Sequence, residues 1–270
     1  MTAMKKDTLK GKTALVTGGT RGIGRAISEK LAEAGAGLIL HARLISDSVQ
    51  QFAHKLGEEN GIAVDCVAAD FINPTNIDRM FDQISAAGLD IDILINNAGF
   101  ETTFAAEDMP LADWQAVLQV NLNAPFRCSQ EAARRMKKKG EGGVIINISS
   151  IHDTVPRKGL AHYCAAKAGL RMLGHCTALE WAEYGVRVVN VSPGAIETDM
   201  NREAIENFGR DKFESWIPAR RLGNTSDIAS MVCFLCSNEA SYLTGTDIYI
   251  DGAYMRNLVR YDDRPGRSST

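Results

Sequence analysis

The stretch Thr17-Gly-Gly-Thr-Arg-Gly-Ile-Gly24 decides the fold, because it joins a short apolar run at 13–17 to a segment with helical spacing. The apolar residues of that segment share one helical face: Ile23, Ile27, Leu31 and Ala34. Gly18 permits a tight turn, and Gly22 and Gly24 omit side chains where a pyrophosphate would approach backbone N–H groups at a helix start. A glycine-rich turn can also be only a tight connection. Its place between a strand and a helix favours dinucleotide binding.

Seven short apolar runs, rich in β-branched residues, recur along the chain. They lie at 13–17, 37–41, 64–68, 91–96, 144–149, 186–191 and 247–250. The stretches between them have helical spacing, and strands that alternate with helices indicate βαβ units with right-handed crossovers. The sequence therefore predicts an α/β fold, a doubly wound, Rossmann-like parallel sheet of about seven strands with helices on both faces. Ligands are expected beyond the carboxyl ends of the strands.

No linker, low-complexity tract or internal repeat divides the chain, so a single domain over 1–270 is expected. The segment 198–218 stands apart as an insertion in which Phe208, Phe213 and Trp216 lie among charged residues. We expect it to be a mobile substrate lid, and the alternative is a fixed helical hairpin on the sheet edge. A polar C-terminal tail at about 255–270 is expected to be a surface extension.

The composition excludes several classes of protein. The 270 residues are 45% hydrophobic and 23% charged, as in soluble globular proteins, and a net charge of −3 makes nucleic acid an unexpected partner. No run of about 18 apolar residues occurs and residues 1–12 are polar, so we expect a cytoplasmic protein with no membrane partner. Cys233 and Cys236 form a lone CxxC without a second ligand pair, so no metal site is expected.

The end of the second apolar run predicts which dinucleotide binds. NAD enzymes normally place a carboxylate there to accept from the ribose 2′-OH, whereas NADP enzymes supply an arginine. The chain has Ala42 and then Arg43, and Arg21 in the glycine-rich loop adds a second guanidinium suited to a phosphate. NADP is therefore the expected cofactor, with NAD possible. The alternative is that both arginines are ordinary surface residues.

Tyr163-Cys-Ala-Ala-Lys167 carries the candidate chemistry. It lies in a stretch rich in Ala and Leu that should be helical, so the i, i+4 spacing puts Tyr163 and Lys167 on one face. An adjacent ammonium favours the phenolate and is expected to lower the pKa of Tyr163, which would make this residue a usable proton donor and acceptor. Ser150 follows the fifth apolar run and can polarise a substrate oxygen at the sheet edge where ligands bind.

Together these features resemble the short-chain dehydrogenase/reductase family over residues 8–254. The loop is similar to the family's Thr-Gly-x-x-x-Gly-x-Gly motif, and Asn96-Asn-Ala-Gly99 resembles the motif after its fourth strand. Asp70 matches the family's acidic position that contacts adenine, and Asn121 matches its catalytic asparagine. Ser192-Pro-Gly194 with Thr198 resembles the family's segment that holds the nicotinamide carboxamide. The resemblance implies an enzyme that moves a hydride between a nicotinamide and a secondary alcohol or ketone, and it implies a homotetramer.

The resemblance also implies a role for each residue. Tyr163 would be the acid/base and Ser150 would orient the substrate oxygen. Lys167 would bind the nicotinamide ribose and lower the pKa of Tyr163, and Asn121 would support a water-linked proton relay. The residues expected to bind the cofactor are Thr17, Gly18, Thr20, Arg21, Gly22, Ile23, Gly24, Arg43, Asp70, Phe71, Asn97, Ala98, Gly99, Tyr163, Lys167, Pro193, Gly194, Ile196 and Thr198. The residues expected to contact the substrate are Ser150, His152, Tyr163 and Glu101.

Within the family, the segments around Glu101, His152 and Tyr163 are similar to bacterial glucose 1-dehydrogenases and related sugar or polyol dehydrogenases. A sugar or polyol substrate, oxidised to a ketone or a lactone, is therefore expected. The chain departs from that group at Asp251-Gly-Ala253, where a second glycine is usual, and in its extra C-terminal tail.

Three alternatives are weighed against this function. The basic run at 134–139 is expected to be a solvated helix end, where cations complement the helix dipole. If the run is functional it would dock an acidic carrier, which keeps 3-oxoacyl-carrier-protein reductase as an alternative enzyme. A non-catalytic dinucleotide-binding regulator would be expected to lack Ser150, Tyr163 or Lys167, and all of them are present. A hydrolase built from Ser150, His152 and Asp153 is disfavoured, because no Gly-x-Ser-x-Gly elbow occurs.

Overall fold

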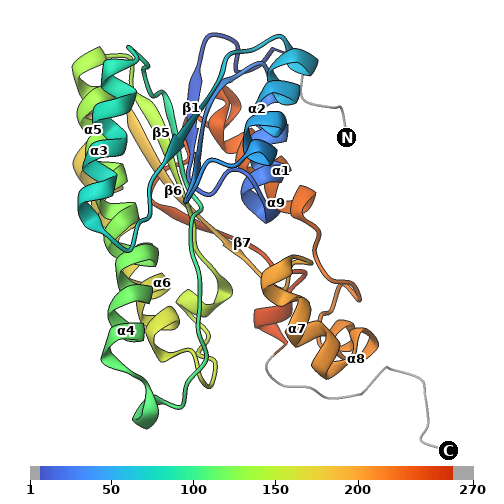
Figure 1. Cartoon of the computed structure of the whole chain (residues 1–270). Coiled ribbons are helices and arrows are strands. Elements are labelled where there is room, and N and C mark those ends of the chain that lie inside the picture. The colour runs from blue at the N-terminus through green and yellow to red at the C-terminus, as the bar shows by residue number, and fades with distance from the viewer. Residues whose placement is uncertain (1–6, 258–270) are drawn as a thin grey trace, which may run out of the picture.

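The computed structural model describes residues 7–257 of the chain. Its centre is one sheet of seven parallel strands in the order β3-β2-β1-β4-β5-β6-β7 (Figure 1). The strands are β1 (Thr13–Val16), β2 (Gly37–Ala42), β3 (Val64–Ala68), β4 (Ile93–Asn96), β5 (Gly143–Ile148), β6 (Val186–Pro193) and β7 (Thr246–Ile250). Every predicted apolar run is a strand, and the Rossmann-like fold is confirmed.

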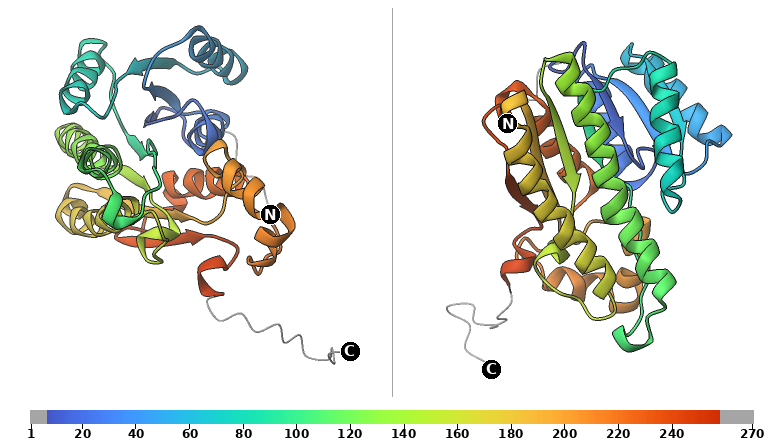
Figure 2. Two further views of the ribbon diagram at one scale, coloured as in Figure 1. Left: turned by 60° about the horizontal axis from the view of Figure 1, so that its bottom comes forward. Right: turned by 90° about the vertical axis from the view of Figure 1, so that its left-hand side faces the viewer.

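Helices form a layer on each face of the sheet, as the left view of Figure 2 shows. One layer consists of α1 (Gly22–Glu33), α2 (Asp47–Asn60) and α9 (Thr225–Cys236), and the other of α3 (Pro74–Ala86), α5 (Ala124–Lys139) and α6 (Ala161–Trp181). Successive strand residues point to opposite faces, so Leu15 packs in the core under α3 and α5, whereas Val16 packs under α1 and α9. Because both faces are covered, the central strands are mostly apolar.

A row of hydrogen-bonded polar side chains runs across the four neighbouring strands β4, β5, β6 and β7. Asn96 Nδ2 donates to Asn147 Oδ1 at 2.9 Å, and Asn147 Nδ2 donates to Asn190 Oδ1 at 3.0 Å. Asn190 Nδ2 then donates to Asp247 Oδ1 at 2.8 Å. These residues are register partners in β4, β5, β6 and β7. Because a buried amide is costly without a partner, the row specifies the register of these strands.

The remaining helices lie around the carboxyl ends of the strands (Figure 1). α4 (Leu111–Leu118) continues through a π-helical turn at Gln119–Asn123 into α5. The predicted insertion at 198–218 contains α7 (Asp199–Phe208) and α8 (Arg210–Ser215).

The chain after β7 packs against the insertion. The rings of Phe213 and Tyr254 lie 6.2 Å apart, and Asn257 Nδ2 donates to the Trp216 carbonyl at 3.1 Å. The predicted tail therefore starts with a 3-10 turn at Tyr254–Arg256, in which Met255 is buried. Residues 258–270 of the tail lie outside the described residues.

The described residues contain neither a candidate membrane-spanning helix nor a candidate metal cluster. No helix between residues 7 and 257 is long and apolar enough to cross a membrane. In the same part of the chain, no group of three or more His, Cys, Asp or Glu side chains is arranged to hold a metal ion. Cys233 and Cys236 belong to α9 and lie on its buried face, in the core.

Candidate active site

The glycine-rich loop between β1 and α1 has the backbone shape of a phosphate-binding turn. Gly18 and Gly22 have φ angles of +63° and +52°, a region that favours glycine. Arg21 at the N-cap of α1 makes no side-chain cap bond, and no acidic residue lies in the first turn. The positive end of the α1 dipole is therefore left without a protein anion, as the binding of a phosphate requires.

The structure gives Gly24 a different role from the predicted one, which was to leave room for a pyrophosphate. A Cβ at Gly24 would lie 2.1 Å from the Gly18 carbonyl oxygen and 2.4 Å from Asn97 Nδ2. A Cβ at Gly22 would meet only Thr198 Cγ2, at 3.9 Å. The structure therefore assigns Gly24 to the close packing of α1 against the loop, while Gly22 is required by its positive φ.

His41, at the end of β2, holds the loop from one side. Its Nδ1 accepts the Gly18 N–H at 3.1 Å, and its Nε2 lies 2.9 Å from the Ala69 carbonyl oxygen. The ring stacks on Phe71 with centroids 4.2 Å apart. Since Nδ1 accepts and Nε2 donates, the imidazole is neutral, and burial lowers the pKa of His41 to about 4. Sequence reasoning missed this residue, whose only signal was a polar side chain in an apolar strand.

The loop after β4 holds the same turn from the other side. Asn97 Nδ2 donates to the carbonyls of Thr17 and Gly18 at 2.9 and 3.1 Å. Thr17 Oγ1 accepts the N–H groups of Asn97 and Ala98 at 2.9 and 3.0 Å. The side chains of Thr17 and Asn97, both predicted to bind the cofactor, are thus engaged in joining the two loops.

The predicted cofactor arginines are both exposed. Within residues 7–257, neither the Arg21 nor the Arg43 guanidinium has a hydrogen-bond or ion-pair partner. Ala42 is buried, so the end of β2 presents no carboxylate. The phenyl ring of Phe71 is buried against His41, and Asp70 Oδ1 accepts the Ile72 N–H at 3.1 Å. This edge of the site therefore offers unpaired positive charge.

Ser150, Tyr163 and Lys167 meet between the end of β5 and the start of α6. Ser150 is a neighbour of the Tyr163 hydroxyl and acts to lower its pKa, and Ser150 Oγ accepts the His152 N–H at 3.1 Å. Lys167 Nζ donates to the Ile148 carbonyl at 2.9 Å and lies 5.5 Å from the centre of the Tyr163 ring. Tyr163 and Lys167 are only 8% and 4% exposed. Both side chains thus share one helical face, in a site that excludes most water.

The expectation that Lys167 lowers the pKa of Tyr163 is wrong for the protein side chains alone. Burial raises the pKa of Tyr163 well above its ordinary value, and the Glu101 carboxylate raises it further, against a lowering hydrogen bond from Ser150. Burial also lowers the pKa of Lys167 to about 8, although Asp153 and Glu101 act in the opposite direction. Desolvation dominates because both groups lie in the interior.

Asn121 lies in the π-helical turn between α4 and α5, and such turns are frequent at functional sites. Its Nδ2 donates to the carbonyls of Phe100 and Val117 at 2.8 and 2.9 Å. Its Oδ1 is buried and has no partner among the described residues. A Cβ at Gly99 would lie 2.6 Å from this Oδ1 and 3.8 Å from Lys167 Nζ. Gly99 therefore keeps open the space between the amide and the ammonium.

The predicted nicotinamide segment runs from the end of β6 to α7. Gly194 N–H donates to the Ile250 carbonyl at 3.0 Å, and a Cβ at Gly194 would lie 2.6 Å from Asp251 Cβ. Ile196 is buried and pairs with Gly223. Thr198, at the N-cap of α7, faces the glycine-rich loop at Gly22. The segment thus borders the same space as the phosphate-binding turn.

Of the predicted substrate residues, Glu101 lies near Tyr163, and the His152 N–H donates to Ser150 Oγ. Glu101 is half-buried, and burial raises its pKa while the charges of Arg157 and Lys167 lower it. His152 Nδ1 lies 2.9 Å from the Val155 carbonyl oxygen, and burial lowers the pKa of His152. A neutral imidazole and a carboxylate are therefore both present near Tyr163.

Asp153 is a second residue that sequence reasoning missed as part of the site. It is 4% exposed, and hydroxyl groups surround its carboxylate: Ser192 Oγ at 2.6 Å, Thr154 Oγ1 at 2.9 Å and Tyr249 Oη at 3.2 Å. Ser192 and Tyr249 are 39 and 96 residues away in sequence. No local pattern could reveal these contacts.

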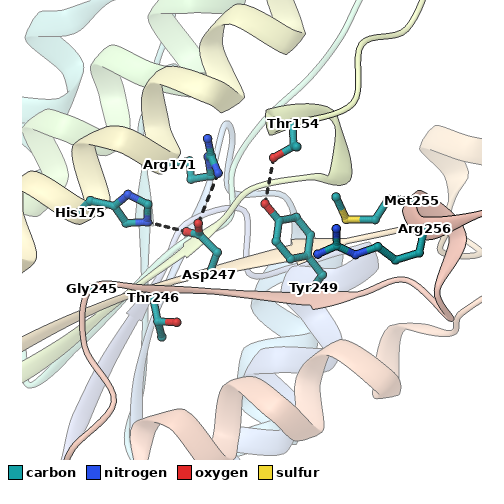
Figure 3. Close-up of a pocket in the computed structure, with 9 residues that line it drawn as sticks. All are labelled: Thr154, Arg171, His175, Gly245, Thr246, Asp247, Tyr249, Met255 and Arg256. Carbon is teal, nitrogen blue, oxygen red and sulfur yellow. Dashed lines mark hydrogen bonds and ion pairs between the residues drawn. The ribbon is translucent and has the colours of Figure 1, made fainter. Parts of the chain in front are cut away.

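A separate pocket of about 510 Å³ lies between α6 and β7 (Figure 3). At one side, His175 Nε2 and Arg171 contact Asp247 at 2.8 and 3.5 Å. At the other side, Thr154 Oγ1 and Tyr249 Oη lie 2.9 Å apart. None of the predicted site residues lines this pocket.

The chain is similar to curated enzymes along most of its length. Residues 18–255 match the family model described as enoyl-(acyl carrier protein) reductase. Glucose 1-dehydrogenase 2 of Bacillus subtilis is 33% identical, over 92% of this chain and 96% of its own. The 3-oxoacyl-[acyl-carrier-protein] reductase of Escherichia coli is 40% identical, over 90% of this chain and 96% of its own.

Solved structures show the same relationship. A gluconate 5-dehydrogenase from Burkholderia cenocepacia, in complex with NADP and tartrate, superposes with a TM-score of 0.87 at 32% identity. The match covers 93% of this chain and 98% of that one. Because these matches cover most of the chain and the site contains Ser150, Tyr163 and Lys167, this chain is an oxidoreductase that acts on CH–OH groups. The chain belongs to the short-chain dehydrogenase/reductase family.

Proposed function

We propose that this protein is an NADP-preferring oxidoreductase that interconverts a secondary alcohol and a ketone, or a lactone, on a sugar or polyol. The observation that carries the proposal is the meeting of Ser150, Tyr163 and Lys167 beside an uncapped, glycine-rich helix start. The unpaired guanidiniums of Arg21 and Arg43 support NADP over NAD, because a 2′-phosphate would pair with them.

The proposed proton chemistry rests on the side chains of this chain, with a bound nicotinamide supplying or accepting the hydride. Ser150 orients the substrate oxygen and Tyr163 exchanges a proton with it. In reduction, the Tyr163 hydroxyl donates its proton to the oxygen as the carbonyl carbon gains the hydride. In oxidation, Tyr163 must first be a phenolate, which its raised pKa disfavours. The protein side chains alone therefore keep Tyr163 in its protonated form, which is the form that reduction uses.

Lys167 and Asn121 are proposed to support that exchange. The Lys167 ammonium would bind the nicotinamide ribose, and it lies in the same small space as Asn121 Oδ1. That oxygen is a buried acceptor without a protein partner, as a water-linked proton relay would need.

The sugar or polyol substrate is supported by the polar mouth of the site. Glu101 and His152 offer a carboxylate and a neutral ring nitrogen as hydrogen-bond acceptors for hydroxyl groups. Glucose and gluconate dehydrogenases are among the similar proteins.

The second candidate, 3-oxoacyl-carrier-protein reductase, is favoured by the 40% identity to the Escherichia coli enzyme. The basic run expected to dock a carrier is largely engaged within the chain. Arg134 pairs with Glu131 at 2.6 Å, Arg135 donates to Ser85 Oγ at 2.6 Å, and Lys139 pairs with Asp92 at 2.8 Å. This weakens the case for a carrier dock.

We also propose that the enzyme is a cytoplasmic homotetramer. Phe126 of α5 and Met172 and Leu179 of α6 are 44%, 54% and 83% exposed, and such apolar side chains suit an interface between copies. The six cysteines are all free, which fits a reducing compartment. Light scattering during gel filtration would test this assembly: four times the chain mass is expected, and a monomer contradicts it.

A substrate panel tests the proposed function. We expect the highest kcat/KM for a sugar or polyol with NADP(H), and a lower value with NAD(H). A neutral sugar, a sugar acid, an acyclic polyol and a 3-oxoacyl thioester would each be assayed with both cofactors. Turnover of the thioester alone would replace the proposal with the second candidate, and equal kcat/KM for both cofactors would remove the NADP preference.

A further inference from the structure

We propose that Asp153 is a positioning residue of the hydride-transfer site, whose buried carboxylate ties together three segments of the site and supplies negative charge to the Lys167 ammonium. This role rests on the proposed function of Tyr163 and Lys167.

Hydrogen bonds connect Asp153 to residues of β6 and β7. Asp153 lies in the 3-10 turn Ile151–Asp153, directly after Ser150. Ser192 Oγ donates to its Oδ2 at 2.6 Å, and Ser192 immediately precedes the proposed nicotinamide segment. Tyr249 Oη, from the edge strand β7, donates to Oδ1 at 3.2 Å. One carboxylate therefore fixes the chain after β5 relative to the carboxyl ends of β6 and β7.

Thr154, which lines the pocket between α6 and β7, also belongs to the hydrogen-bond network around Asp153. Thr154 Oγ1 donates to Asp153 Oδ1 at 2.9 Å. Thr154 Oγ1 also lies 2.9 Å from Tyr249 Oη, and Figure 3 shows this second contact. A buried carboxylate is costly unless it is hydrogen-bonded, and these three hydroxyl groups fulfil that need. A buried charge with such partners acts on its surroundings through a low dielectric.

Asp153 is also one of the charges that act on Lys167. Burial opposes the ammonium form of Lys167, and Asp153 is the larger of the two charges that favour it, Glu101 being the other. Asp153 and Glu101 also oppose the phenolate form of Tyr163, and the Cys164 thiol adjoins that ring on the same helix. Asp153 thus raises the pKa of both members of the pair.

The test compares Asp153→Asn with the wild type in the full chain. The substitution keeps the shape and removes the charge, so the pKa values of Tyr163 and Lys167 should both fall. We expect both limbs of the kcat pH profile to move to lower pH by about half a unit or more. A residue that only stabilised the fold would reduce the rate without moving the limbs. Unmoved limbs in folded Asp153→Asn would overturn the proposal.

Three further variants separate charge from positioning. Ser192→Ala removes one hydrogen bond to Asp153 and keeps the Asp153 charge, so the limbs of the kcat pH profile should stay in place. The affinity for NADP should fall by about fivefold, as for one lost hydrogen bond. Asp153→Glu restores the charge and should return the limbs toward the wild-type pH. Asp247→Asn, a carboxylate in the same sheet, is the control for loss of stability and should leave the limbs unmoved.

Failure of this inference is distinguishable from failure of the proposed function. If Tyr163→Phe is inactive but Asp153→Asn leaves the limbs in place, only the role of Asp153 falls. If Tyr163→Phe is active, the proposed roles of Tyr163 and Lys167 fall as well.

Discussion

His41 joins the acid stability of the molecule to the shape of its phosphate-binding turn. Its pKa is about 4 in the folded chain, because of burial, against an ordinary value of 6.5. The unfolded chain therefore binds more protons between these two values, and stability is lost as the pH falls from 6.5 toward 4. The expected loss is roughly 2–3 kcal/mol by pH 4.5.

Urea unfolding at pH 7.5 and pH 4.5 checks this prediction. His41→Gln keeps a hydrogen-bonding side chain but cannot titrate, so its stability should fall less with acid than that of the wild type. His54, which is exposed on α2, provides the matched control, and His54→Gln should retain the wild-type pH dependence. An identical acid loss in His41→Gln and the wild type would refute the role of His41.

Cofactor choice is also argued at the level of single residues. Ala42 is buried, so an aspartate there would disturb the strand, and the exposed Arg43 and Arg21 are better targets. Replacing either by alanine removes a charge-assisted bond, so the KM for NADP should rise by about 10-fold or more and that for NAD should hardly change. Arg25→Ala is the control, because Arg25 pairs with Glu29. Equal effects on both cofactors would count against a 2′-phosphate site.

At the level of elements, the polar row through β4 to β7 is predicted to specify strand register. Asn190→Leu would leave Asn147 Nδ2 without its acceptor and remove the donor to Asp247, at a cost of roughly 2–4 kcal/mol in the free energy of unfolding. Asn60→Ala, at the end of α2, should cost under about 1 kcal/mol. Urea midpoints measure both. A cost for Asn190→Leu no larger than for Asn60→Ala would show that the row is dispensable.

The segment 198–218 remains a predicted lid. Its α8 end is anchored through Phe213 and Trp216, whereas α7 is tied back through Asn201 Nδ2, which donates to the Ile196 carbonyl at 2.8 Å. A hinge at Gly209, with φ of +78°, separates the two helices. We expect hydrogen exchange in α7 to slow only with cofactor and substrate bound, with β5 unchanged. Equal, strong protection in every state would establish a fixed hairpin.

Across the whole molecule, the predictable features were those carried by local patterns. The alternation of apolar runs with helical stretches predicted the parallel sheet. The i, i+4 spacing of Tyr163 and Lys167 predicted that both lie on one face of a helix. The missed features depend on tertiary contacts. Asp153 accepts a hydrogen bond from Tyr249, which lies 96 residues away in sequence. In the sequence His41 resembles any other strand residue, and only the fold brings it to the Gly18 N–H. The pKa of Tyr163 was predicted in the wrong direction because burial, which spacing does not reveal, outweighs the nearby ammonium.

The proposal that Tyr163 exchanges the substrate proton is tested most directly by turnover of Tyr163→Phe. This change keeps the ring and removes only the titrating oxygen, so kcat should fall by about 10²–10⁴-fold while NADP affinity stays within about threefold. Tyr242→Phe, on a fully exposed tyrosine, is the matched control and should keep wild-type turnover. A Tyr163→Phe enzyme that retains more than about a tenth of the wild-type kcat would contradict the acid/base role.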